Sequence, residues 1–465
     1  MYARQLRLNI RHADNGELRN LIVGLAGIQR NIDKANRTDG RVQNLASYIN
    51  EETLKAAYTR MDGKKAVGID KVTKDEYGEN LDENLKNLVA RMKKGAYNPH
   101  PSRRVYIPKD NKGKMRPLGI SSFEDKLVET VIAEILTQIY EPKFYGFSYG
   151  FRPGRSCHMA VRETIKDIQF HYTNWVVEAD IRGFFDNVDH KWLMRMLEHD
   201  IADRKLLDII QRFLDAGVME DGKYLDIETG TPQGNGISPV LANIYLHYVL
   251  DNWFDVVVGR SCNGECHLVR YADDFIVCFA YPNDARWFIG ALRSRFGKYG
   301  LQLAEDKTKM IEFGKCAERN RKARGEGKPE TFDFLGFTFY CSKNTERTFF
   351  RCKVKTSKKK FRNKLRAMKE WIRLHRNMPL EWLFRKLNEK LRGHYQYYGV
   401  TDNVIECVKF YRHTVWFLYK YLNRRSQKRS YNKNTFFNGL LKTFSLVTPR
   451  IRVSLYYRDA NGIVV

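Results

Sequence analysis

Three aspartates, in two separate stretches of the chain, have the clearest chemical potential. Asp180 ends the apolar stretch 175–181, which we expect to be a strand, and Asp273 and Asp274 fall at the expected turn of a β-hairpin over 267–279. Carboxylates brought together from two strands would suit a hard cation such as Mg²⁺, which prefers oxygen ligands. Two such ions about 4 Å apart promote phosphoryl transfer by activating a hydroxyl and stabilising the leaving oxygen.

An Asp-Asp pair alone would be weak support for such a site, because aspartate is common in solvated turns. Here the string Tyr271-Ala-Asp-Asp274 lies between the apolar flanks Leu268-Val-Arg and Phe275-Ile-Val-Cys-Phe. Those flanks predict two buried strands, which would hold the acidic turn in one place.

The remaining elements must position these acids, and the periodicity of apolar residues predicts a mixed α/β part followed by a helical part. We expect strands at 103–109, 115–120 and 332–340, an exposed loop at 314–328, and helices at 53–61, 80–92, 123–139, 190–199, 204–216, 238–254 and 284–299. After Lys355 we expect basic helices at 361–375, 380–393 and 404–423.

The charge is distributed unevenly along the chain. The net charge is +27, and residues 355–465 carry 26 Lys/Arg against 6 Asp/Glu, a net +20. This asymmetry favours a polyanion such as nucleic acid held mainly by the C-terminal part, the alternative being a solvated basic surface. The sequence predicts no membrane span, because no apolar run reaches about 18 residues, no secretory signal, and reduced thiols of a cytoplasmic protein.

A series of motifs then indicates a family. In chain order they are RRVYIPK and KMRPLGI (103–120), SYGFRPGRSCHMAV (148–161), ADIRGFFDNVDH (179–190), TPQGNGISPVLANIYL (231–246), RYADDFIVCF (270–279), GLQLAEDKTKMI (300–311), FLGFTFY (334–340) and LRGHYQYYG (391–399). Over about residues 50–460 the chain resembles bacterial group II intron-encoded reverse transcriptase/maturases that lack the C-terminal nuclease domain.

The resemblance implies an α+β right-hand polymerase fold, with fingers, a palm built on an antiparallel sheet, and a helical thumb. The expected divisions are a basic N-terminal extension (1–50), fingers (51–178), palm (179–345), thumb/maturase region (346–400) and a basic helical segment that could bind DNA (401–465). Residues 1–50 could brace a partner or be a simple extension.

The resemblance also implies roles at the acidic site. Asp180 and Asp273 would bind two Mg²⁺ ions, for which Mn²⁺ could substitute, and Asp274 and the Ile181 carbonyl would complete the site. Lys307 or Lys309 could assist near the primer or nucleotide.

Further residues match the family's nucleotide pocket. Phe185 would be the steric gate that excludes a 2′-hydroxyl, and Gln233 would contact the incoming nucleotide. Arg103, Lys109 and Arg116 would grip the triphosphate, since guanidinium and ammonium groups bind phosphate oxygens. Asn235 departs from the usual Pro-Gln-Gly-Gly string; because Asn tolerates a positive φ, we expect the turn to survive.

The expected partners are an RNA template with its primer, dNTPs, a structured intron or other non-coding RNA, and a DNA target. The expected location is the bacterial cytoplasm, at the nucleoid when DNA is bound. Three alternatives remain open: a domesticated relative used in phage defence, CRISPR spacer acquisition or DNA repair; an RNA-folding protein without polymerase activity; and an RNA-dependent RNA polymerase, which Phe185 disfavours. Cys262 and Cys266 precede His267, but one Cys-x3-Cys pair does not supply a zinc site, and we predict none there.

Overall fold

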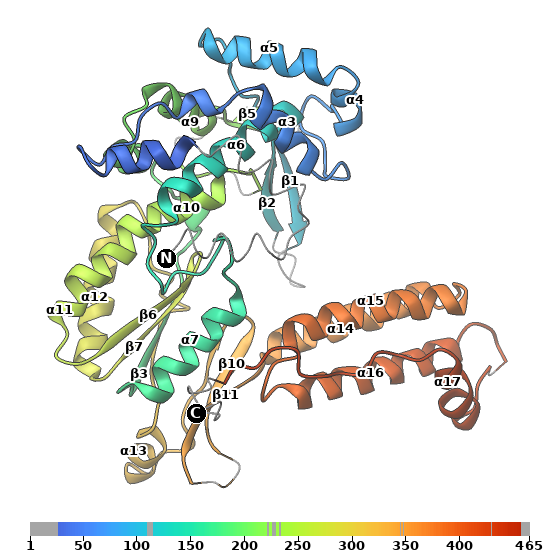
Figure 1. Cartoon of the computed structure of the whole chain (residues 1–465). Helices are drawn as coiled ribbons and strands as arrows, with labels where there is room; N and C mark the ends of the chain where they lie inside the picture. Colours follow the sequence, from blue (N-terminus) through green and yellow to red (C-terminus); the bar gives the residue numbers. More distant parts are fainter. Residues whose placement is uncertain are drawn as a thin grey trace.

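The computed structural model describes residues 27–108, 115–220, 223–225, 229–231, 234–344, 346, 348–428 and 430–456. Its helices and strands are arranged like an open right hand (Figure 1). The fingers lie at the top of the view, the palm at the left centre, and the thumb helices extend to the lower right. The α+β right-hand architecture expected from the sequence is therefore confirmed. Within the described residues, no helix is both long enough and apolar enough to cross a bilayer.

The fingers combine short helices with a four-stranded sheet. Asn50 and Thr53 cap the N-terminus of α3: each side chain accepts a hydrogen bond from the other residue's backbone N–H. The sheet order is β2-β1-β4-β5, with β1 and β2 forming an antiparallel hairpin. The elements here are α3 (Glu51–Arg60), α4 (Lys74–Gly78), α5 (Leu81–Lys93), β1 (Ser102–Pro108), β2 (Met115–Ile120), α6 (Phe123–Tyr140), β4 (Val218–Glu220) and β5 (Lys223–Leu225).

The palm is built on a four-stranded antiparallel sheet in the order β6-β7-β3-β8. Successive side chains of a strand point to opposite faces, and here both faces are buried. Val177 packs in one core with Phe288 of α12, whereas Val176 packs in a second core with Ile165 of α7. The strands are β3 (Trp175–Ala179), β6 (Cys266–Tyr271), β7 (Asp274–Phe279) and β8 (Lys309–Glu312).

Helices α7 (Cys157–Phe170) and α12 (Pro282–Lys298) pack on strands of this sheet. Other helical elements between β3 and β9 are the 3-10 turn η3 (Phe184–Asp186), α8 (His190–Asp200), α9 (Arg204–Asp215), α10 (Ser238–Leu246), α11 (Gly259–Ser261) and α13 (Ala317–Ala323). The helix that begins at Ser238 continues through two π-helical segments, His247–Asp251 and Phe254–Val258.

A three-stranded sheet, in the order β11-β10-β9, connects the palm to the thumb. Its strands are β9 (Phe332–Phe334), β10 (Phe337–Lys343) and β11 (Phe350–Thr356). The thumb consists of α14 (Lys358–His375), α15 (Leu380–Tyr398) and α16 (Val404–Leu422), followed by η6 (Thr435–Leu440) and α17 (Leu441–Thr443). Because α14, α15 and α16 share one apolar core, packing continues across residue 400, where the sequence analysis placed a boundary.

Two local expectations were wrong. The predicted strand 332–340 is two strands, because Leu335 (φ +49°) and Gly336 (φ +79°) form a two-residue turn between paired Phe334 and Phe337. Turns with two positive φ values match the twist of a hairpin. The predicted loop 314–328 contains α13, whose Arg324 side chain contacts Glu312 of β8.

Residues 27–50, for which the sequence left two interpretations open, pack against the fingers and palm. Ile28 and Leu45 are completely buried in the core shared with the fingers and palm. The backbone N–H groups of Leu45 and Ala46 both donate to Asp203 Oδ2, at 2.5 and 2.8 Å. This segment therefore packs against the start of α9.

Candidate active site

The turn between β6 and β7 carries two of the three acids. Tyr271 pairs with Asp274, so Ala272 and Asp273 form a two-residue turn. Ala272 has a φ of +56°, a left-handed conformation that costs a non-glycine residue about 1–2 kcal/mol. Contacts from neighbouring residues must therefore hold this turn.

A buried ion pair provides the first of these contacts. The Arg270 guanidinium donates from Nε and Nη2 to the two Asp251 carboxylate oxygens at 2.7 and 2.5 Å, and both side chains are 0% exposed. Its Nη1 donates to the Ala272 carbonyl and to Asn243 Oδ1, each at 3.0 Å. The palm interior thus fixes the main chain of the acidic turn through one arginine.

The segment 147–150 provides the second contact. Tyr149 N donates to the Arg270 carbonyl at 2.8 Å, and Arg270 N donates to the Phe147 carbonyl at 2.9 Å. A Cβ atom on Gly150 would lie 2.2 Å from the Ala272 nitrogen, so only glycine permits this approach. The SYGF string of the sequence therefore supports the back of the acidic turn.

Asp180 reaches the same end of the sheet from β3. Strands β3 and β7 are antiparallel with Ala179 opposite Phe275, so the next position along the ladder sets Asp180 opposite Asp274. Opposed Cα atoms in such ladders are about 4.5–5.5 Å apart. The Asp180 carbonyl accepts from Ala304 N at 2.8 Å, and Ile181 forms a bridge with Leu303, which fixes the backbone here. The structure thus brings together the two stretches that the sequence analysis singled out.

The electrostatics of this end reflect three carboxylates held close together. Partial desolvation, with the negative charges of Asp273 and Asp180, raises the pKa of Asp274 to about 6. Lys307 Nζ donates to Asp180 Oδ2, and this bond raises the pKa of Lys307. A divalent cation such as Mg²⁺ prefers oxygen ligands and would offset the repulsion between neighbouring carboxylates. These residues therefore fit such an ion.

A cavity of about 660 Å³ joins the acidic end of the palm to the thumb. Its palm side includes Asp180, Asp274 and Lys307, and its thumb side includes lysines of α14 and tyrosines of α15. The thumb residues are Lys359, Lys360, Lys364, Tyr397 and Tyr398. Acids on one wall and ammonium groups on the other suit a phosphate backbone that passes over a metal site.

Phe185, the predicted steric gate, lies in η3, five residues after Asp180 in the chain. Its ring is partly exposed and meets the buried Phe184 ring edge-on, with 5.3 Å between centroids. Thr231 N donates to the Phe185 carbonyl at 2.7 Å, and a Cβ on Gly230 would lie 2.9 Å from the same oxygen. The strand-like stretch 229–231 therefore sets the backbone of Phe185.

The loop after Gln233 differs from our expectation. Gln233 itself lies outside the described residues. The positive φ falls on Gly234 (+113°), where a Cβ would lie 2.8 Å from the Gly119 carbonyl of β2. Asn235 does not need a positive φ; it is buried, and its Nδ2 lies 3.2 Å from Ser102 Oγ of β1. Asn235, the residue that departs from the family string, therefore attaches this loop to strand β1 of the fingers.

A buried glutamate that sequence reasoning missed supports the same loop. Glu129 of α6 is 0% exposed and accepts from Ser121 Oγ at 2.6 Å and from Gly236 N at 2.7 Å. Burial raises the pKa of Glu129 to about 7. The tripeptide Glu-Thr-Val within an apolar helix was the available signal, because a charged residue on a buried face needs partners.

The predicted triphosphate-binding residues lie on the fingers hairpin, except Lys109, which is outside the described residues. Arg103 pairs with Ile120 and Arg116 pairs with Ile107. By the alternation of a strand, both arginines point to the same face of the hairpin, four rungs or about 13 Å apart. Arg103 donates from Nη2 to the Val67 carbonyl at 2.7 Å, whereas Arg116 is exposed. The structure places both on one surface, and their contact with a triphosphate stays a prediction.

Comparisons with known proteins bear on both halves of the chain. The family model described as reverse transcriptase (RNA-dependent DNA polymerase) matches residues 107–339, and the group II intron maturase-specific domain matches residues 358–437. Group II intron-encoded protein LtrA of Lactococcus lactis subsp. cremoris is 47% identical over 185 residues, which is 40% of this chain and 30% of LtrA. The match thus spans less than a third of that relative.

A second relative is covered over most of its length. Protein YkfC of Escherichia coli strain K12 is 32% identical over 331 residues, or 62% of this chain and 86% of YkfC. A telomerase structure from Candida albicans aligns with 80% of this chain and 67% of its own, at 14% identity and a TM-score of 0.42. The maturase match favours the group II intron lineage over a domesticated defence or repair enzyme. The chain belongs to the reverse transcriptase family and carries a group II intron maturase-specific domain.

Proposed function

We propose that this chain is an RNA-directed DNA polymerase that copies RNA into cDNA by two-metal phosphoryl transfer. The observation that carries the proposal is the convergence of Asp180, Asp273 and Asp274 at one end of the palm sheet. Their clustered negative charge, seen in the raised pKa of Asp274, gives divalent cations a place to bind. The lysine-lined wall opposite gives a nucleic-acid backbone a place to lie.

The catalytic roles follow from this arrangement. Asp180 and Asp273 would hold two Mg²⁺ or Mn²⁺ ions, with Asp274 and the Ile181 carbonyl completing the site. When bound, the ions would activate the primer 3′-hydroxyl and stabilise the leaving pyrophosphate. The network of Arg270 keeps the Ala272–Asp273 turn in place, so the acids need little rearrangement before the reaction.

Other residues would orient and select the nucleotide. Phe185 would fill the space that a ribose 2′-hydroxyl needs, so that dNTPs are used in preference to rNTPs. Gln233 would contact the nucleotide, and Arg103, Lys109 and Arg116 would bind its triphosphate. A partly exposed Phe185 beside a buried Phe184 supports this assignment, because only one of the two rings is available to a substrate.

The thumb would bind a structured intron RNA as a maturase. The match at 358–437 and the net +20 of residues 355–465 support this part of the proposal. A DNA target would bind the same basic region, including residues 401–465, and the protein would act in the bacterial cytoplasm, at the nucleoid when DNA is bound.

Primer extension tests the enzymatic proposal. We expect the purified chain to extend oligo(dT) on poly(rA) with dTTP when Mg²⁺ is present and to stop when EDTA is added. Filter binding of the same template to the Asp273→Asn variant provides the control. A chain that binds RNA but extends no primer with either Mg²⁺ or Mn²⁺ would be an RNA-folding protein instead.

A further inference from the structure

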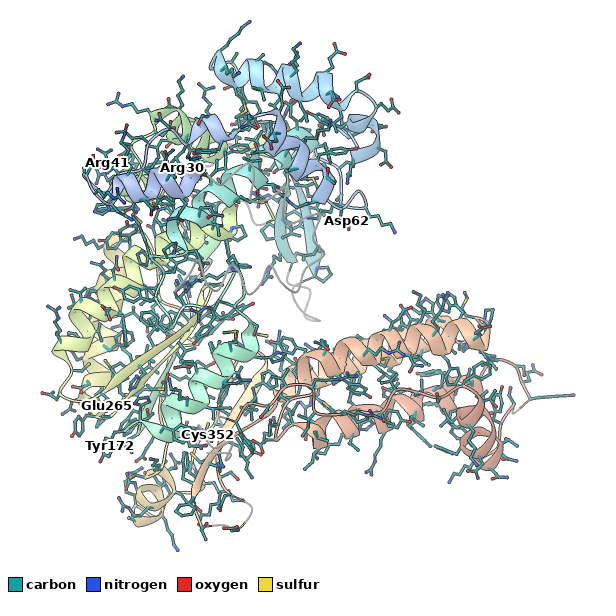
Figure 2. All side chains as sticks on the ribbon, viewed as in Figure 1. Arg30, Arg41, Asp62, Tyr172, Glu265 and Cys352 are labelled. Carbon is teal, nitrogen blue, oxygen red and sulfur yellow. The ribbon has the colours of Figure 1, made fainter. Side chains whose placement is uncertain are left out.

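A second cluster of metal-ligating side chains lies at the opposite end of the palm sheet from the acidic turn. The donor atoms of Asp167, His171 and His267 all lie within 4.8 Å of one another. Glu265 adds a fourth donor, because its Oε2 is 3.5 Å from His171 Nδ1 and 3.6 Å from His267 Nε2. Figure 2 shows Glu265 next to Tyr172 at the lower left edge of the palm, and Tyr172 N donates to that same Oε2 at 3.1 Å.

The spacing of these residues explains how two elements deliver four donors. Asp167 lies in the last turn of α7, and His171 follows the helix as its C-cap, where the chain becomes extended. Glu265 and His267 are two residues apart at the start of β6, and residues at i and i+2 lie on one face of a strand. Helix α7 packs on β6, which brings the two pairs together.

Two of the four donors make no hydrogen bond within the described residues, although Glu265 Oε2 lies 3.6 Å from His267 Nε2. The Asp167 side chain is in a residue only 4% exposed, and its carboxylate has no hydrogen bond or ion pair within the described part of the chain. His267 Nε2 is buried and has no hydrogen-bond partner there either. Largely buried groups without hydrogen bonds are costly, and an ion bound between these two side chains would satisfy both.

We propose that Asp167, His171, His267 and Glu265 bind a Zn²⁺ ion. Tetrahedral zinc takes imidazole and carboxylate ligands at about 2.0–2.2 Å, which places neighbouring donor atoms about 3.3–3.5 Å apart. The distances of 3.5 and 3.6 Å from Glu265 Oε2 to the two imidazoles are close to that spacing. Two imidazoles favour zinc over Mg²⁺, which prefers oxygen donors and water.

The surroundings suit this ion. The two imidazole rings lie 4.2 Å apart between centroids, so both can turn a nitrogen towards the same point. A cavity of about 500 Å³, lined by Glu163, Asp167 and His267 among others, gives an ion access.

The site would be structural. It would join the C-terminal end of α7 to the beginning of the hairpin that carries the acidic turn. The other end of α7 reaches the thumb, where His158 Nε2 lies 2.8 Å from the Tyr397 carbonyl. Zinc would therefore hold the helix that contacts both the hairpin and the thumb.

Zinc binding by the full chain tests the proposal. The measurement uses the Asp180→Asn/Asp273→Asn background, so that the catalytic carboxylates do not bind the probe. After dialysis against buffered Zn²⁺ we expect one zinc per chain by elemental analysis. His171→Gln/His267→Gln should weaken zinc binding by more than about 100-fold, since losing only a hydrogen-bond partner of a metal ligand costs about 10- to 100-fold. His413→Gln, at an exposed histidine of the thumb, should bind zinc like its parent.

Thermal unfolding provides a second readout. Zn²⁺ should raise the unfolding temperature of the parent and of His413→Gln, but not that of the double variant. If the double variant does not fold, the near-isosteric Asp167→Asn takes its place. Equal zinc uptake by the altered and parent chains, or stabilisation by Mg²⁺ and not by Zn²⁺, would overturn the proposal.

Discussion

The two ends of the β6–β7 hairpin present different chemistry. At the turn, Asp180, Asp273 and Asp274 offer only oxygen donors, and Lys307 supplies the nearest positive charge. At the other end, two imidazoles and two carboxylates meet between a helix and a strand. The first set suits hard cations that retain water and exchange with substrate, whereas the second suits a tightly held, softer ion.

The two ends also differ in how they are supported. The turn is fixed from behind by the buried pair of Arg270 and Asp251, because Arg270 also donates to the Ala272 carbonyl. The helix end has no comparable buried ion pair among the described residues, and its own donors would be tied together by the proposed zinc. The acidic turn is thus supported by protein groups behind it, whereas the proposed zinc site would be supported by the bound ion itself.

The largest expected effect is at the turn. Asp273→Asn should lower kcat of primer extension by at least about 10⁴-fold, or ~5.5 kcal/mol, because a neutral amide cannot hold the metal pair. Single-turnover extension with saturating template measures this loss. Retention of more than a tenth of the activity would show that the turn is not the metal-binding end.

Breaking the support of the turn should cost nearly as much in stability. Asp251→Asn leaves the Arg270 charge buried without its counter-ion, which should lower the free energy of unfolding by about 3–5 kcal/mol in a urea titration. The matched control is Arg293→Gln, which breaks an exposed pair with side chains 56% and 58% exposed and should cost under about 1 kcal/mol. Similar losses for both variants would contradict the buried anchor.

Metal exchange should separate the two ends. After EDTA treatment and desalting, Mg²⁺ alone should restore primer extension at 25 °C, and Zn²⁺ alone should restore the unfolding temperature. Zinc at about 100 times its Kd would contribute roughly 2.7 kcal/mol of stability. Recovery of both properties with Mg²⁺ alone would mean that the two ends do not differ in metal preference.

A smaller effect is expected at the predicted gate. Phe185→Ala should raise the kcat/KM for rNTPs relative to dNTPs by about 10-fold, ~1.4 kcal/mol, because the space for a 2′-hydroxyl opens. The control is Phe184→Leu. Because the Phe184 ring is buried, its loss should lower stability and leave sugar selection unchanged. Gel-based extension with each nucleotide measures the ratio, and an unchanged ratio in Phe185→Ala would rule out the gate.

The smallest effect concerns pH. Because Asp274 has a pKa of about 6 without metal, protons compete with Mg²⁺ below that pH and not above it. The Mg²⁺ concentration for half-maximal extension should be flat from pH 8 to 7 and rise towards about 10-fold per pH unit below 6. A flat dependence down to pH 5 would place the titrating carboxyl elsewhere.

The sequence alone located the acidic turn, because a short acidic string between two apolar strands has few other uses. It could not locate Arg270 with Asp251 and Asn243, since those residues pair across 19 and 27 positions of the chain and each looks like an ordinary polar residue. Leu335 was assigned to a strand because leucine rarely adopts a positive φ, and only the pairing of Phe334 with Phe337 shows the turn.

The second cluster was equally hidden. His267 follows Cys266 in the sequence, which directed attention to the Cys-x3-Cys pair rather than to Asp167 a hundred residues earlier. Helix α7 was not among the expected helices, so the spacing of Asp167 and His171 carried no meaning before the fold was known. Sites assembled from two elements need the packing of those elements, which local patterns do not contain.

The contact between Lys307 and Asp180 has a consequence for how cofactor ions enter. The ammonium group acts as an internal counter-ion for Asp180, so a divalent cation held by Asp180 would have to displace a tethered charge, which would lower the ion's affinity. Lys307, released in that exchange, would then be available to the negative charge of a triphosphate.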